Sequence, residues 1–96
     1  MELTLIIVTP AGAMQPVGCD SVHLTVCDDL QGKGGGSYGI RAGHTKTLLA
    51  LEKGGLSAFA GGKNVLDGES GSGFATVDKD VVTAVVEFFT PKSSDE

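Results

Sequence analysis

Apolar and polar residues alternate with a period of two along much of this chain of 96 residues. The clearest example lies in the segment 19–27, where Val22, Leu24 and Val26 alternate with the polar residues Ser21, His23 and Thr25. Such alternation is typical of a strand with one buried face. The apolar run at residues 3–8 predicts a first strand, which Pro10 ends because proline cannot donate a ladder hydrogen bond.

Further short strands, bounded by turn residues, are predicted at 14–17, 38–41, 45–51, 56–60, 63–66, 73–77 and 81–88. Residues 45–51 are also apolar enough for a single helical turn, but Lys-Gly-Gly at 53–55 favours a strand closed by a hairpin. Hairpin turns are also predicted at Gly61-Gly62, at Asp67-Gly68 and at 78–80. No segment has a period of 3.6 residues, so no long helix is expected.

The pattern predicts one all-β domain at residues 1–89, a flattened two-layer β-sandwich or barrel of about 8–10 short strands. A chain of this length has room for a single domain with a thin core. The glycine-rich residues 31–36 are expected to form a loop, and 90–96 a polar tail that need not fold.

Charge and composition narrow the classes of partner. A net charge of −5 with scattered basic residues disfavours nucleic acid, because duplex binding relies on clustered lysine and arginine. The apolar run at 3–8 is too short to span a bilayer, so no transmembrane segment is expected. Glu2 stands where a signal peptide carries basic residues, so no signal peptide is expected. Two cysteines, Cys19 and Cys27, make no disulfide framework and are expected to be reduced.

Motifs for common site chemistries are incomplete. Gly61-Gly62-Lys63 is followed by asparagine, and the glycines at 34–36 lack the lysine and helix of a phosphate-binding loop. Cys19, His23 and Cys27 are spaced by four residues, about 13 Å on a strand, which one metal ion cannot bridge. No nucleophile elbow is present. We therefore expect no cofactor, no metal site and no enzymatic activity.

Five motifs occur in a recognisable order: LTLIIVTPAG, CDSVHL, GSYGIRAGH, LLALEKGGL and GSGFATVDKDVVTAVV. Their succession, over residues 2 to 88, resembles the N-terminal β-sandwich domain of the epsilon subunit of F-type ATP synthases (delta in mitochondria). The resemblance implies a rotor subunit of the central stalk, which links the gamma subunit to the membrane c-ring and transmits rotation. It also implies a peripheral location on the cytoplasmic face of the membrane, as part of the F1 complex.

The resemblance also implies a contact loop for gamma and the c-ring, consisting of Tyr38, Ile40, Arg41, Gly43 and His44. Arg41 is the best candidate for pairing with an acid on a partner. An apolar strip, normally covered by gamma and including Leu5, Val8 and Phe59, is expected to be exposed in the isolated chain.

Three features depart from the family pattern. Ser37 stands where the loop often has an acid, Ala42 replaces a proline, and Gly-His is followed by Thr-Lys instead of Ala-Pro. The polar residues 91–96 do not match the family's C-terminal helical hairpin, so neither nucleotide binding nor inhibition of ATP hydrolysis is expected from this sequence. The alternative is a free-standing β-sandwich binding module that keeps only the epsilon-like scaffold.

Overall fold

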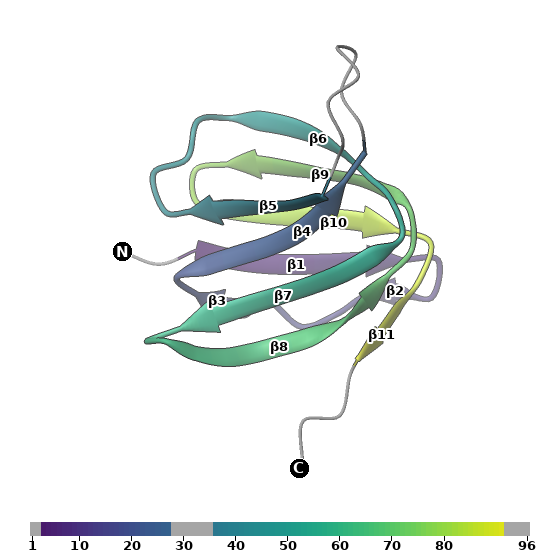
Figure 1. Ribbon diagram of the computed structural model, residues 1–96, viewed down its shortest axis with the longest axis horizontal. Coiled ribbons are helices and arrows are strands. Elements are labelled where there is room, and N and C mark those ends of the chain that lie inside the picture. The colour runs from purple at the N-terminus through teal and green to yellow at the C-terminus, as the bar shows by residue number, and fades with distance from the viewer. Residues whose placement is uncertain (1–2, 28–35, 92–96) are drawn as a thin grey trace.

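The computed structural model describes residues 3–27 and 36–91, and within them it contains strands and no helix (Figure 1). The eleven strands are β1 (Leu3–Thr9), β2 (Gly12–Ala13), β3 (Val17–Cys19), β4 (Ser21–Val26), β5 (Gly36–Arg41), β6 (Thr47–Leu51), β7 (Gly54–Ala60), β8 (Lys63–Ser70), β9 (Gly73–Asp78), β10 (Val81–Val86) and β11 (Phe89–Pro91). The predicted all-β fold class is therefore confirmed.

The strands form a single mixed sheet that curls into two layers. Its order is β11-β8-β7-β4-β6-β9-β10-β1-β2, with β3 added beside β1 and β5 beside β4. Only β1 and β10 pair in parallel; all the other pairs are antiparallel. In Figure 1 the layer of β5, β4, β7 and β8 lies in front of the layer of β6, β9, β10 and β1.

The antiparallel pair β6–β9 in one layer continues as the pair β7–β8 in the other layer, and both pairs keep the same register. Thr47 of β6 lies opposite Val77 of β9, and Gly54 of β7, seven residues later, lies opposite Ser70 of β8, seven residues earlier. The bend between these pairs brings backbone and side chains close together. A Cβ atom on Gly54 would lie 2.5 Å from Thr25 Oγ1, so only glycine fits there without displacing Thr25.

The inward-facing positions of both layers form the hydrophobic core. They alternate along the strands as the sequence pattern requires, and each is at most 3% exposed: Leu3, Leu5, Ile7, Cys19, Val22, Leu24, Ile40, Leu51, Leu56, Ala58, Ala75, Val77, Val82, Ala84 and Val86. Burying such a set is the main favourable term in folding. The core therefore fixes which face of every strand remains outside.

Two predicted hairpins are confirmed. The β7–β8 turn has positive φ at Gly61 and Gly62 (60° and 80°), and the β9–β10 turn has positive φ at Lys79 and Asp80 (51° and 64°). Positive φ at both central residues is the geometry of a type I′ turn, whose twist suits a two-residue hairpin.

Two other predicted hairpins are wrong. β8 continues as a strand through Asp67-Gly68, and Gly68 does not have the positive φ of a tight turn. Because Gly68 has no side chain, it leaves room for Phe89 of β11. At 53–55, β6 and β7 do not pair with each other. They follow one another along the same edge of β4, opposite Val26 and His23 respectively.

The ends of several segments also differ from the prediction. The strand predicted at 14–17 is replaced by β2 and β3, which flank Pro16, a residue without an amide hydrogen. Thr90 and Pro91 belong to β11 and pair with β8, although the sequence assigned them to the tail. The loop at 31–35 and the tail at 92–96 lie outside the described residues.

Candidate contact surfaces

The connection from β5 to β6 is held by hydrogen bonds of His44. The Tyr38 hydroxyl lies 3.1 Å from His44 Nε2, and His44 Nδ1 lies 2.8 Å from the carbonyl oxygen of Thr45. Because a carbonyl only accepts, Nδ1 carries the hydrogen and Nε2 accepts from Tyr38. The two rings are also in edge contact at 5.9 Å. The connection is therefore anchored to β5.

A second anchor ties the same connection to the β9–β10 turn. Gly43 has φ of 85°, which glycine adopts without strain, and its amide donates to Asp80 Oδ1 at 2.7 Å. The His44 amide also donates to the Arg41 carbonyl oxygen at 3.2 Å. Residues 42–46, which we call the 42–46 turn, are thus fixed to both layers.

The five predicted contact residues fall into different environments. Arg41 and Gly43 are exposed, whereas Tyr38 and His44 are half-buried and hydrogen-bonded to each other. Ile40 is fully buried, because it points into the core from the inner side of β5. Its side chain packs the core and has no surface to offer a partner, so the contact predicted for it is wrong. The other four residues remain candidates.

The outer side of the β6-β9-β10-β1 layer carries apolar residues in rows across the strands. One row is Ala50, Phe74, Val85 and Val8, and the next is Leu48, Thr76, Thr83 and Ile6. Residues directly opposite one another project from the same side of a sheet. Leu48 is 69% exposed, Phe74 45% and Val81, on the same side, 36%. We call this surface the apolar outer face.

The apolar outer face contains two adjoining shallow hollows that share Leu48. One, of about 480 Å³, is lined by Leu48, Leu49, Ala50 and Phe74. The other, of about 430 Å³, extends towards Lys46 and Asp78. An apolar surface with a charged border is typical of a protein interaction site.

The predicted apolar strip is only partly correct. Leu5 is fully buried, because it faces the core from the inner side of β1. Val8 is half-buried on the apolar outer face, whereas Phe59 lies on the other layer, opposite Ser21. Sequence reasoning missed Leu48, Phe74 and Val81. Each of these residues is an apolar residue at a position that faces outward in the alternating pattern of its strand. They can be recognised from the sequence only when it is known which positions of the strand face the core.

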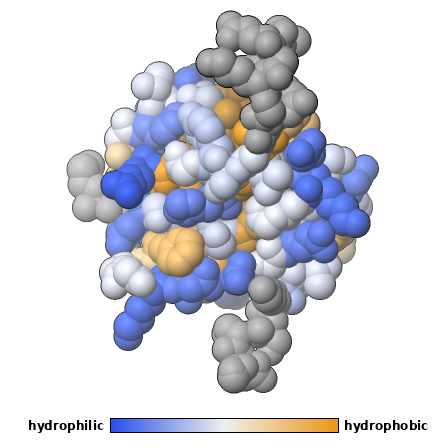
Figure 2. Space-filling view, in the orientation of Figure 1, coloured by the Kyte–Doolittle hydropathy of each residue, from blue (hydrophilic) through white to orange (hydrophobic). Residues whose placement is uncertain are grey.

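The outer side of the other layer is polar. One row of residues that lie opposite one another is Arg41, Ser21, Phe59 and Asn64. The next row is Gly39, His23, Ser57 and Asp67. His23 and Phe59 make an edge contact at 5.4 Å. Figure 2 shows this side, where hydrophilic and neutral colours dominate and hydrophobic colour is confined to separate areas. The two sides of the molecule therefore differ in the partners that they suit.

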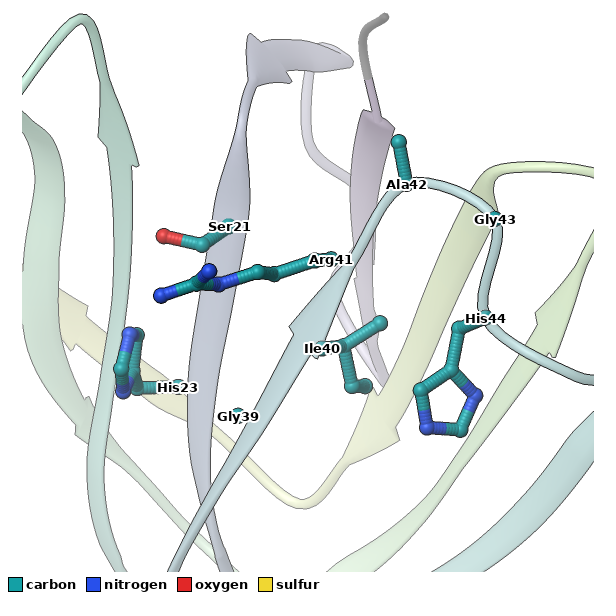
Figure 3. Close-up of a pocket in the computed structure, with 8 residues that line it drawn as sticks. All are labelled: Ser21, His23, Gly39, Ile40, Arg41, Ala42, Gly43 and His44. Carbon is teal, nitrogen blue, oxygen red and sulfur yellow. The ribbon is translucent and has the colours of Figure 1, made fainter.

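A hollow of about 380 Å³ lies where β4, β5 and the 42–46 turn meet. Figure 3 shows Ser21, His23 and the guanidinium of Arg41 on one side of β5, with Ile40 and His44 on the other. Within the described residues, no group of three or more His, Cys, Asp or Glu side chains is placed to hold a metal ion. Nor does that part of the chain contain a helix long and apolar enough to cross a membrane.

Comparison with solved structures shows where this fold occurs. One similar chain belongs to the cryo-EM structure of the Euglena gracilis mitochondrial ATP synthase, OSCP/F1/c-ring in rotational state 1. The TM-score is 0.78 at 22% identity, and the match covers 94% of this chain and 53% of that one. Another belongs to the central stalk and c-ring of the Tetrahymena thermophila mitochondrial ATP synthase. There the TM-score is 0.71 at 14% identity, covering 94% of this chain and 66% of that one.

The chain thus spans about half of the first neighbour and about two thirds of the second. At these identities the likeness establishes a shared fold. No family model and no curated protein matches the sequence.

Proposed function

We propose that this chain is a non-catalytic rotor subunit of an F-type ATP synthase, which links the gamma subunit to the c-ring and transmits rotation. The order of the five sequence motifs and the fold shared with chains of ATP synthase assemblies both support this function. Membership of such a complex would place the chain at the cytoplasmic face of the membrane, held there by its partners.

The observation that carries the proposal is the apolar outer face. Leu48, Phe74 and Val81 are exposed on a layer whose opposite side faces the hydrophobic core, so this layer has apolar residues on both sides. Exposed apolar residues gathered on one face are typical of a protein interaction site. We assign this interaction to the gamma subunit.

The 42–46 turn is assigned to the c-ring end of the contact. It leads directly into β6, which carries Leu48, so the two contact regions are continuous along the chain. Its backbone is fixed by the hydrogen bonds of His44 and Gly43. A turn that is rigid before binding loses little conformational entropy when a partner is bound.

The test is to mix the purified chain with the gamma subunit of the same source and follow co-elution by size-exclusion chromatography. We expect a stable pair, and we expect Leu48→Lys to weaken it by about thirtyfold or more, as charge in the centre of an interface does. Val65→Lys is the matched control, because Val65 is 45% exposed but lies on β8, outside the apolar outer face.

Two results would contradict the assignment: absence of a pair between folded proteins at micromolar concentration, or equal loss with Leu48→Lys and Val65→Lys. The first would favour a free-standing β-sandwich binding module. The hollow beside Arg41, where polar groups converge, is the observation that supports such a binding module.

A further inference from the structure

Three hydrogen-bond donors from two strands meet on the polar outer side, at the hollow beside the 42–46 turn. Arg41 of β5 lies directly opposite Ser21 of β4, and His23 lies opposite Gly39, one step along the same side. Figure 3 shows the Arg41 guanidinium extending past Ser21 on the side where His23 lies. The guanidinium, the imidazole and the hydroxyl therefore border one space.

Gly39 provides the floor of this space. Its Cα carries no side chain, and the position that a Cβ would take lies 3.6 Å from His23 Cε1. A larger residue at 39 would occupy the area between Arg41 and His23. The floor is stable because the neighbouring inward residues, Ile40 and Val22, are fully buried.

The side-chain donors in this space have no acceptor within the part of the chain that the structure describes. Among the described residues, the side chains of Arg41 and Ser21 form no hydrogen bond or ion pair, and that of His23 has only its ring contact with Phe59. No aspartate or glutamate of the described segments lines the hollow. Two carboxylates near the hollow in sequence or contact accept backbone hydrogen bonds: Asp20, next to Ser21, accepts from the Gly61 amide at 2.6 Å, and Asp80 accepts from the Gly43 amide at 2.7 Å.

We propose that Arg41, His23 and Ser21 form a binding site for one carboxylate side chain of a partner protein. The guanidinium supplies a planar pair of N–H donors that matches a carboxylate, and the histidine and serine donate to its remaining lone pairs. That the partner is a stalk or c-ring protein rests on the proposed function. The carboxylate chemistry depends only on this chain.

A protein carboxylate fits this site better than an anionic membrane surface. Membrane electrostatics is effective with clusters of several lysines and arginines. Here Arg41 is the only arginine of a chain with net charge −5. A single arginine beside an imidazole and a hydroxyl recognises one anion at short range, and the remaining negative charge of the chain repels an anionic bilayer.

The binding chemistry can be tested on the isolated chain by NMR titration with two peptides, acetyl-Gly-Glu-Gly-amide and acetyl-Gly-Gln-Gly-amide. We expect saturable shifts of the Arg41 Nε–H and His23 ring signals with the glutamate peptide and none with the glutamine peptide. Arg41→Ala should weaken binding about tenfold, because it removes hydrogen bonds to a charged group. Arg41→Lys keeps the positive charge but lacks the planar pair of N–H donors, so its affinity for the glutamate peptide should lie between those of the wild type and Arg41→Ala.

Two matched variants separate the site from general charge effects. Lys53→Ala removes the same charge from an exposed position away from the hollow and should leave the affinity unchanged. Gly39→Val, at a position without positive φ, should fill the floor and abolish the shifts while all three donors remain.

Equal shifts with both peptides, or equal losses with Arg41→Ala and Lys53→Ala, would overturn the proposal. So would Arg41-dependent pelleting with phosphatidylglycerol vesicles in the absence of peptide binding. Failure to pair with gamma would refute the proposed function while leaving this titration unaffected.

Discussion

The amide of Gly43 donates a hydrogen bond to the carboxylate of Asp80, 37 residues further along the chain. It connects the 42–46 turn to the β9–β10 hairpin. We expect Asp80→Gly to lower the free energy of unfolding by about 1 kcal/mol, because the bond is lost while glycine still accepts the positive φ. Urea denaturation measures the loss.

Amide hydrogen exchange at Gly43 distinguishes this bond from the turn itself. The Gly43 amide should exchange faster in Asp80→Gly than in the wild type. Asp80→Asn, which keeps a side-chain carbonyl and tolerates the left-handed conformation, should preserve most of the protection. Unchanged exchange in Asp80→Gly would show that the bond is absent in solution.

Two adjacent glycines at the bend should respond differently to the same substitution. Gly54→Ala would bring a methyl group to within 2.5 Å of Thr25 Oγ1, whereas nothing lies within 4 Å of the same position on Gly55. Overpacking of this kind costs about 1–3 kcal/mol, while Gly55→Ala should be neutral or slightly stabilising. Thermal unfolding of the two variants, measured side by side, checks this difference; equal melting temperatures would contradict it.

Tyr38→Phe should show how much the turn depends on the hydroxyl. The ring contact with His44 remains, but the half-buried Nε2 loses its donor, so we expect a loss of about 1 kcal/mol in unfolding free energy. Ser37→Ala, which removes an exposed hydroxyl next door, should have no effect. Nitrogen-15 NMR of His44 should show the hydrogen on Nδ1 in the wild type; a hydrogen on Nε2 would refute the bond.

Ile40 and Arg41 are neighbours with opposite roles. Ile40→Ala should cost about 2–5 kcal/mol of stability, as large-to-small changes in a core do. Arg41→Ala should leave stability nearly unchanged and alter only partner or peptide binding. Chemical denaturation together with the titration described above measures both effects. A large stability loss with Arg41→Ala would make that residue structural.

The sequence predicted the elements that depend on local chemistry. The alternation at 19–27 and the apolar run at 3–8 correspond to β4 and β1. When one face of a strand is buried, the two-residue period determines which side chains face the core. Gly61-Gly62 became a tight turn because glycine adopts positive φ without strain. Residues 78–80 also became a turn, in which the positive φ of Asp80 is one that aspartate tolerates, whereas the positive φ of Lys79 is unusual for lysine.

The errors concern long-range packing. Whether Gly68 turns the chain or makes room for Phe89 depends on β11, which begins 21 residues later and so lies outside the local sequence pattern. Leu5 and Leu48 look alike in the sequence, yet one is fully buried and the other is 69% exposed. Arg41 was predicted from the sequence to pair with an acid on a partner, but its grouping with His23 was not predicted, since the two residues come together only through the pairing of β4 with β5.

The unbroken register between the strand pairs that cross the bend has a mechanical consequence. A sideways load applied to the apolar outer face reaches the polar layer along covalent backbone and ladder hydrogen bonds, in addition to side-chain packing. Sliding one layer over the other would require those hydrogen bonds to break together. The body should therefore deform little under torque, and force received on one side can be delivered on the opposite one.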